Sequence, residues 1–226
     1  MHRVQKLLSN YGYCSRRNAE ELIKEGRVKV NDKLITIGDQ ATFDDEIKVN
    51  DKVVPKGEKV YLMLNKPVGC VSALHDRHER TIMEFIDIKE RVFPVGRLDK
   101  DTSGLLLLTN DGDFSNKVTH PSNEVKKTYV AKLDKVLSDK DLKKVEKGVD
   151  LEDGKTSPAK LELMQGSFVS IEIHEGKNRI VRRIFEAVGY KVLKLKRVKI
   201  GNLSLDKLEP GKYKLLQKSD LDKAII

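Results

Sequence analysis

The most informative stretch of the chain is Gly96-Arg97-Leu98-Asp99-Lys100-Asp101-Thr102-Ser103-Gly104-Leu105-Leu106-Leu107-Leu108-Thr109-Asn110-Asp111-Gly112. Its first half places an arginine and two carboxylates in one loop between two glycines. The run 104–109 is apolar enough for a buried strand, and the turn sequence after it leads into a helix around 113–118. Loops carried on a rigid scaffold are favoured positions for catalysis. The stretch therefore predicts a reactive loop entering a buried strand.

The residues before this stretch predict a small unit of their own. Apolar spacing predicts a helix over 2–10 and a second helix that Ser15 caps and that runs through Ile23. Short strands are expected near 27–30, 34–37 and 46–49. Segment 51–59 contains Pro55 and Gly57 and is typical of a linker. We therefore expect a first domain over residues 1–57 and a second over residues 60–226.

The second domain is predicted to mix strands and helices without a regular repeat. Strands are expected over 60–64, 104–109, 128–133, 161–164, 168–173 and 191–200, with 161–164 and 168–173 paired. Helices are expected over 113–118, 138–147 and 178–188. This order favours an α+β fold over a doubly wound one.

The distribution of charge points to a polyanionic partner. The 226 residues carry a net charge of +9. Residues 175–199 hold nine Lys and Arg against two Asp and Glu, whereas residues 1–57 hold eleven against nine. Such a concentrated basic patch favours nucleic acid through counterion release, although a solvated lysine-rich surface would give the same count.

Composition also bounds where the protein works. No apolar run approaches the roughly 20 residues that span a bilayer, and the start lacks the apolar core of a signal peptide. Cys14 and Cys70 are far apart and lack zinc-type neighbours, so we interpret them as two reduced thiols. These features predict a cytoplasmic protein that has no contact with membranes.

The predicted helix over 178–188 combines an apolar face with arginines. Its apolar positions are spaced i, i+3, i+4 and i+7, at Val181, Ile184, Phe185 and Val188. Arg179, Arg182 and Arg183 lie on the other side, with Arg182 toward the flank. Arg182 could therefore reach a cleft while its neighbours contact phosphates, but an ordinary amphipathic surface helix would show the same pattern.

Two other patterns suggest different chemistry. Asp99-Lys100-Asp101-Thr102 also fits a magnesium-assisted phosphotransferase pattern with a phosphorylated aspartate, but that pattern normally follows an apolar strand. Here Pro94, Gly96 and Arg97 interrupt the approach. The cluster His75-Asp76-Arg77-His78-Glu79 could hold a metal, although its interleaved arginine and loop position favour a solvated or RNA-contacting loop.

Four ordered motifs carry a resemblance to a known family. The stretch 96–112 resembles the signature of the RsuA-type bacterial rRNA pseudouridine synthases. Leu64-Asn65-Lys66-Pro67, Lys127-Thr128-Tyr129 and Glu175-Gly176-Lys177-Asn178-Arg179-Ile180-Val181-Arg182-Arg183 resemble the family's flanking motifs in the same order. About the first 50 residues resemble the alpha-L RNA-binding domain. Ile180 departs from the pattern, because relatives often carry glutamine there.

The resemblance implies a fold, a reaction and a catalytic site. The fold would be the alpha-L domain followed by a mixed, mainly antiparallel sheet flanked by helices. The reaction would convert a uridine to pseudouridine without cofactor or metal. Asp99 would be the catalytic carboxylate, attacking C1′ or removing a proton from C2′, and Arg182 would pair with it. Tyr129 would stack on the base, and it could also accept or relay the C5 proton.

The remaining residue assignments concern RNA contacts and loop shape. Asp101 is expected only to cap a turn, and Lys66 and Pro67 to shape a loop beside the pocket. Residues expected to contact RNA are Arg97, Arg179, Arg183 and Arg197 in the second domain and Arg16, Arg17, Lys24, Arg27 and Lys29 in the first.

The resemblance also implies a substrate. We expect a monomer that acts on ribosomal RNA, with a partly assembled small subunit as one form of the substrate. The short loop 71–84 and the ending 205–213 favour the small-subunit (16S) RNA by analogy. A large-subunit (23S) target and a non-catalytic RNA-binding assembly factor are the alternatives.

Overall fold

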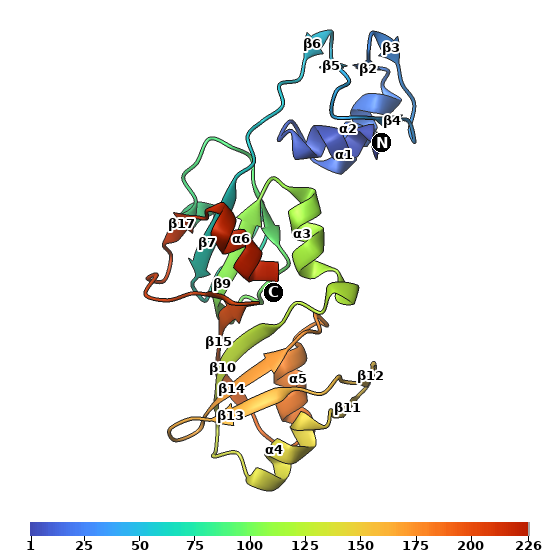
Figure 1. Cartoon of the computed structure of the whole chain (residues 1–226). Coiled ribbons are helices and arrows are strands. Elements are labelled where there is room, and N and C mark those ends of the chain that lie inside the picture. The colour runs from blue at the N-terminus through green and yellow to red at the C-terminus, as the bar shows by residue number, and fades with distance from the viewer. Residues whose placement is uncertain (226) are drawn as a thin grey trace. The chain divides into compact units, whose positions relative to one another are not determined.

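The computed structural model describes residues 1–225 and divides the chain into two units (Figure 1). The first unit comprises Met1–Tyr61, Ile88–Phe93 and Thr109–Phe114, and the second Leu62–Asp87, Pro94–Leu108 and the chain from Ser115 onward. The domain boundary expected between residues 57 and 60 stays a prediction. Among residues 1–225, no helix combines the length and the apolar character needed to cross a membrane.

The first unit consists of two helices and two small sheets. Its elements are β1 (His2–Arg3), α1 (Val4–Asn10), α2 (Arg16–Lys24), β2 (Val28–Val30), β3 (Lys33–Leu34), β4 (Gln40–Ala41), β5 (Ile47–Val49) and β6 (Lys52–Val53). β1 pairs with β4, and the order of the other sheet is β3-β2-β5-β6. The expected cap of α2 is confirmed, because the Ser15 side chain accepts a hydrogen bond from the amide of Asn18.

Two predicted elements of this unit are shorter in the structure. The first helix begins at Val4 rather than residue 2, because His2 and Arg3 pair with the distant strand β4. The strand expected over 34–37 ends at Leu34. Side chains from both helices and the strands, among them Leu7, Ile23 and Val28, form one buried core.

The second unit is built on a nine-stranded sheet. Its strands are β7 (Tyr61–Lys66), β8 (Phe93–Val95), β9 (Thr102–Thr109), β10 (Lys127–Leu133), β13 (Lys160–Leu163), β14 (Phe168–Ile173), β15 (Val192–Ile200), β16 (Leu203–Ser204) and β17 (Tyr213–Leu215). Its helices and short hairpin are η1 (Ile82–Phe85), α3 (Gly112–Thr119), η2 (Pro121–Asn123), α4 (Asp139–Glu146), α5 (Ile180–Ala187), α6 (Lys218–Ile225), β11 (Asp150–Leu151) and β12 (Gly154–Lys155).

The order of the strands places the motifs side by side. The sheet runs β13-β14-β10-β15-β9-β7-β17, with β13, β14, β10 and β15 successively antiparallel and β15 parallel to β9. The mixed, mainly antiparallel sheet flanked by helices is therefore confirmed (Figure 1). β9 leaves the loop that contains Asp99, and β10 and β15 carry Tyr129 and Arg197 opposite each other. Residues from distant motifs thus meet near the centre of the sheet.

One glycine permits this arrangement. Gly104 lies on β9 at φ +109°, where a Cβ would come within 2.1 Å of the carbonyl oxygen of Arg197 on β15. Only a residue without a side chain lets the two strands approach so closely, and the positive φ favours glycine as well. Gly104 therefore fixes the loop that precedes β9 against the strand that carries Arg197.

Candidate active site

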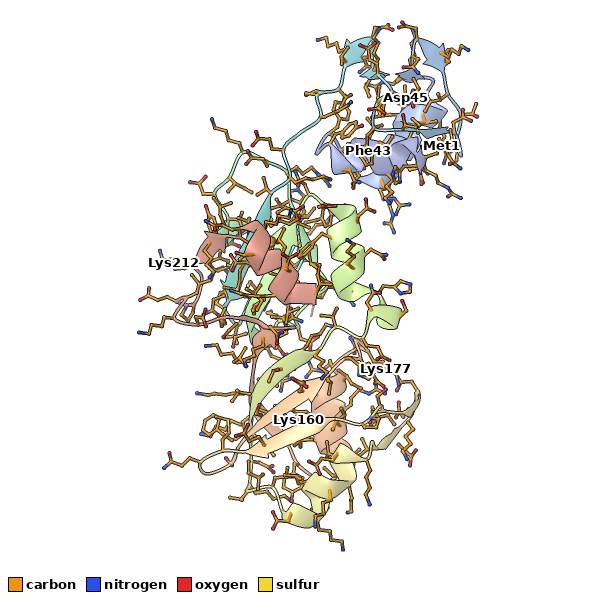
Figure 2. All side chains as sticks on the ribbon, viewed as in Figure 1. Met1, Phe43, Asp45, Lys160, Lys177 and Lys212 are labelled. Carbon is orange, nitrogen blue, oxygen red and sulfur yellow. The ribbon has the colours of Figure 1, made fainter. Side chains whose placement is uncertain are left out.

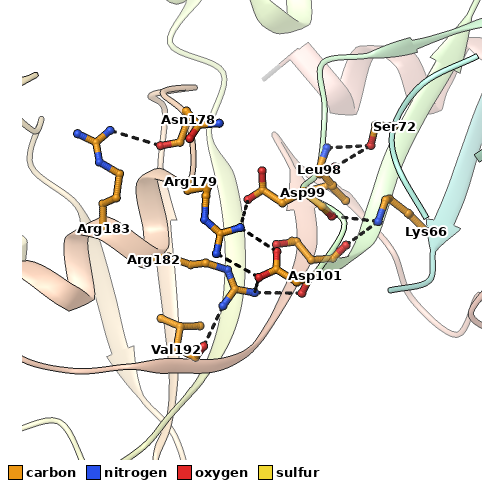
Figure 3. Close-up of polar contacts among 11 residues, drawn as sticks. Lys66, Ser72, Leu98, Asp99, Asp101, Asn178, Arg179, Arg182, Arg183 and Val192 are labelled. Carbon is orange, nitrogen blue, oxygen red and sulfur yellow. Dashed lines mark hydrogen bonds and ion pairs between the residues drawn. The ribbon is translucent and has the colours of Figure 1, made fainter. Parts of the chain in front are cut away.

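A buried lysine anchors the backbone of the loop before β9. Lys66, at the end of β7, is fully buried, and its ammonium donates hydrogen bonds of 3.0 Å to the carbonyl oxygens of Pro67, Asp99 and Thr102. Figure 3 shows Lys66 beside the loop that carries Asp99. Burial lowers the pKa of Lys66. All three ammonium hydrogens have backbone partners, so Lys66 shapes the loop.

A second anchor fixes the other side of the same loop. The hydroxyl of Ser72 donates to the carbonyl of Leu98 at 2.8 Å and accepts from the amide of Leu98 at 3.1 Å. The amide of Gly69 also donates to the carbonyl of Lys100. Asp99 therefore follows a backbone that is held on both sides, while its side chain keeps 32% exposure. The carboxylate is rigidly carried and open to a ligand.

The structure corrects the expected pairing of Arg182 with Asp99. Arg182 instead reaches Asp101, with its Nη2 3.1 Å from the carboxylate and donating to the backbone carbonyl at 3.0 Å. Arg179 forms a bidentate pair with Asp101 at 3.1 Å, and its Nη1 lies 3.8 Å from Asp99 (Figure 3). Asp101 is thus the centre of the ion-pair cluster rather than only a turn cap.

The beginning of α5 explains why two arginines converge on this loop. Arg179 is the N-cap residue, in the left-handed conformation at φ 48°, and Arg182 follows three residues later, on the same face. Arg182 also donates to the carbonyl of Val192 at 2.8 Å, which ties the helix to β15. Although burial raises the pKa of Asp101, the hydrogen bonds from Arg179 and the charge of Arg182 hold it below its ordinary value.

A cavity of about 240 Å³ opens beside Asp99. It is lined by the loop residues 95–99, by the segment 175–181 that contains Lys177 (Figure 2), and by the sheet residues Lys127, Tyr129 and Arg197. The volume lies below the roughly 300–1,000 Å³ of pockets for drug-sized ligands. A single nucleoside is therefore a better match in size than a larger ligand.

Arg197 lies inside the unit rather than on its outer basic surface. The residue is only 3% exposed and lines the wall of the cavity, and its expected contact with RNA stays a prediction. Its Nε donates to the carbonyl of Leu105 at 2.7 Å, and its Nη1 lies 3.4 Å from the hydroxyl of Tyr129. Tyr129 is also buried and lines the cavity, so a ligand reaches its ring from the cavity and not from the protein surface.

Sequence reasoning missed one residue of the cavity. Lys127 precedes Tyr129 by two positions on β10, so both side chains project from the same face of the sheet. Its ammonium donates to the carbonyls of Val125 at 3.0 Å and His174 at 3.3 Å. The alternation of side chains along the strand expected over 128–133 was the signal that could have found it.

The other residues expected to contact RNA differ in availability. Arg16, Arg17, Lys24 and Arg97 are exposed and form no ion pair among residues 1–225. Arg27 pairs with Glu25, Lys29 with Asp51, and Arg183 with Asp153.

The loop that suggested a metal site is held together by its own backbone. The Asp76 carboxylate accepts from the amides of His78 and Glu79, and Glu79 pairs with Lys100 at 2.6 Å. Within residues 1–225, no three His, Cys, Asp or Glu side chains gather as ligands of a metal ion. The charged groups of this segment therefore serve turn geometry and a surface ion pair.

Comparison with known families accounts for both parts of the chain. The model of the RNA pseudouridylate synthase family matches residues 60–187, and that of the S4 domain matches residues 2–47. A solved structure described as a pseudouridylate synthase superimposes with a TM-score of 0.74 and 36% identity, covering 99% of this chain and 100% of that one.

Individual relatives extend over most of the chain. Ribosomal large subunit pseudouridine synthase B of Bacillus subtilis strain 168 is 48% identical, over 93% of this chain and 90% of that protein. An uncharacterized RNA pseudouridine synthase of Aquifex aeolicus is 41% identical, over 97% and 92%. The dual-specificity RNA pseudouridine synthase RluF of Escherichia coli K12 is 38% identical, over 97% and 77%.

Proposed function

Because this chain belongs to the RNA pseudouridylate synthase family, we propose that it isomerises one uridine of ribosomal RNA, with Asp99 as the catalytic carboxylate. The observation that carries this proposal is the position of Asp99. It is a rigidly anchored and partly exposed carboxylate at the mouth of a cavity of nucleoside size, with an arginine 3.8 Å away. A base inside a duplex would have to leave the stack to enter such a cavity.

The chemistry of the isomerisation fits a lone carboxylate. The bond from N1 to C1′ breaks, the base turns, and C5 joins C1′, so the nucleotide gains and loses no atoms. Asp99 can attack C1′ and form an ester with the sugar, or it can take the proton from C2′ and leave a glycal. Both routes use the carboxylate oxygens of Asp99, and Arg179 Nη1 lies 3.8 Å from one of them.

Arg179, the N-cap residue of α5, and Arg182, in its first turn, have different roles in this proposal. Arg179 acts on Asp99 by its charge, whereas Arg182 is a positioning residue that holds the Asp101 backbone and the start of β15. Tyr129 borders the base, and its hydroxyl could receive the C5 proton while Arg197 steadies it. Losing Arg182 should therefore lower turnover by displacing the loop, without removing a group that touches the substrate.

The relatives favour a target in the large ribosomal subunit. The 48% identical protein from Bacillus subtilis is named for that subunit, and it aligns over nearly its whole length. The relatives give no support to the small-subunit target expected from the sequence. The exposed Arg16, Arg17 and Lys24 of the S4 domain would contact the backbone of structured RNA, where shape matters more than base edges.

The test is a complementation experiment in bacteria that lack the gene. Wild type and Asp99→Asn are each expressed there, and pseudouridines are mapped in both ribosomal RNAs. Wild type should restore one site in the large-subunit RNA, and Asp99→Asn should restore none while still binding RNA. Restoration by both proteins would contradict the role of Asp99, and a restored small-subunit site would contradict the proposed target.

A further inference from the structure

Two cations lie beside Tyr129, the half-buried Lys127 and the buried Arg197, and the proposed mechanism gives neither of them a contact with the base. Lys127 and Arg197 both line the cavity, from the neighbouring strands β10 and β15. Tyr129 and Arg197 are directly opposite in the strand register, and Lys127 is two positions from Tyr129 on the same face. The three side chains thus form one wall of the cavity, which we call the cationic wall.

Both cations keep unused capacity to donate hydrogen bonds. An ammonium has three hydrogens, and Lys127 uses two of them on the carbonyls of Val125 and His174. Nη2 of Arg197 is buried and has no hydrogen-bond partner. Neither cation forms an ion pair with a carboxylate among residues 1–225. Buried charges without a counter-charge are costly, so the cavity is prepared for an anionic or electron-rich ligand.

Lys66 shows that a lysine in this unit can have all of its hydrogen-bond donors engaged. All three hydrogens of Lys66 are bound to backbone carbonyls, which leaves it nothing to offer a ligand. Lys127 carries the same ammonium group but is only half-buried and lines the cavity. The difference lies in the missing third partner and in the position on the cavity wall.

We infer that Lys127, together with Arg197, is a catalytic group that stabilises the uracil anion released during the isomerisation. This inference rests on the proposed function. When the bond between C1′ and N1 breaks, its electron pair leaves with the base, and the negative charge spreads over N1, O2 and O4. C5 of the anion then bonds to C1′ as the ester bond to Asp99 breaks or, on the glycal route, as the proton taken by Asp99 returns to C2′. The C5 proton then leaves while N1 takes up a proton, so the product has the same atoms as the substrate. Attack on C1′ and proton removal from C2′ both release this anion, so the inference holds for either route.

Fixed cations of this kind are suited to act mainly in the transition state. Neutral uracil in the bound substrate gains little from them, whereas the departing anion gains a full electrostatic interaction in an enclosed site. Asp99 lines the cavity from the loop before β9, and the cationic wall lies on β10 and β15. The carboxylate would act on the sugar and the cations on the base.

The charge of Lys127 is set by its surroundings. Burial and the nearby charge of Arg197 lower the pKa of Lys127 to about 8. The other ionisable side chains around the cavity are Arg97, Asp99, Glu175, Lys177 and Arg179. The Glu175 carboxylate accepts a hydrogen bond from the amide of Ser157 at 2.6 Å and forms an ion pair with Lys177 at 3.8 Å. Turnover should therefore fall as the pH rises past the pKa of Lys127, because the ammonium loses its proton.

The test compares Lys127→Met with wild type in single-turnover reactions on an RNA fragment that contains the unmodified target uridine. Removing one preorganised donor should slow conversion about 100-fold, and RNA affinity should change less than about threefold. Lys126→Met is the matched control, because Lys126 is 63% exposed and pairs only with Glu172 at 3.6 Å. It should react like wild type.

A better leaving group separates stabilisation of the anion from a structural role. In RNA carrying 5-fluorouridine, fluorine withdraws electrons and stabilises the uracil anion by itself. Loss of the N1-linked nucleoside should then be slowed by Lys127→Met only about tenfold. Equal slowing with uridine and 5-fluorouridine would overturn the inference, and so would a loss of RNA affinity with an unchanged rate.

The pH profile covers the case in which Lys127→Met does not fold. Lys127→Arg keeps the charge at a higher pKa, so the alkaline fall in rate should move upward by at least about one pH unit. An unmoved alkaline limb would overturn the inference. A wild-type enzyme that forms no pseudouridine would count against the proposed function, whereas normal turnover by Lys127→Met would count only against the cationic wall.

Discussion

Replacing Lys66 with methionine should loosen the catalytic loop and destabilise the unit that carries it. The change removes three hydrogen bonds of 3.0 Å, but the carbonyl of Asp99 keeps the amide of Thr102, also at 3.0 Å. The carbonyls of Pro67 and Thr102 therefore lose their charged donor, although that of Pro67 keeps the weak thiol donor of Cys70 at 3.5 Å. A buried acceptor left unsatisfied costs about 1–3 kcal/mol. Methionine buries no charge, which offsets part of this loss. We expect the free energy of unfolding to fall by about 2–4 kcal/mol.

Urea unfolding followed by circular dichroism measures this loss, and hydrogen exchange locates it. Exchange of the Thr102 amide should accelerate, because that amide reports directly on the loop. Lys100→Met is the stability control from the same loop. Lys100 is 52% exposed and pairs with Glu79, so its loss should change the free energy of unfolding by less than about 1 kcal/mol. Wild-type stability and unchanged exchange in Lys66→Met would refute the anchoring role.

Two further substitutions test the cluster and the close strand approach. Asp101→Asn should lower turnover at least about tenfold by releasing two arginines, and it should change the free energy of unfolding by less than about 1 kcal/mol because the carboxylate is 48% exposed. Unchanged turnover would show that the cluster is not needed. Gly104→Ala places a Cβ 2.1 Å from the Arg197 carbonyl and should lower the melting temperature far more than Gly154→Ala, which has a similar φ but open space. Equal shifts would refute the steric reason.

Local pattern was sufficient to predict most elements of the fold. Residue spacing predicted the helix that Ser15 caps, and the pairing of 161–164 with 168–173 is confirmed as antiparallel. Local pattern failed where a distant partner decides the conformation. His2 and Arg3 have helical neighbours, yet they form a strand because Gln40 and Ala41 offer hydrogen bonds from across the unit.

The site was predicted in its members but not in its pairings. Motif order brought Asp99, Tyr129 and the arginines together, but the choice of partner depends on where α5 begins. Because Arg179 takes the left-handed N-cap position, its guanidinium faces the loop, and Asp101 takes both arginines. Residue counts also placed Arg197 in a basic patch, although its alternation on β15 turns it inward against Leu105. Charge density along the chain does not say which face of a strand a side chain occupies.

The number of ammonium hydrogens without a backbone partner decides what Lys66 and Lys127 can each do. Lys66 has all three donors on backbone carbonyls, so methionine there should act on stability first and on turnover through the displaced loop. Lys127 has two donors engaged and borders the cavity, so the same substitution should act first on the rate of bond cleavage and lower the free energy of unfolding less than Lys66→Met does. Two lysines with lowered pKa values thus differ in role because of their partners, and the lowered pKa alone would not separate them.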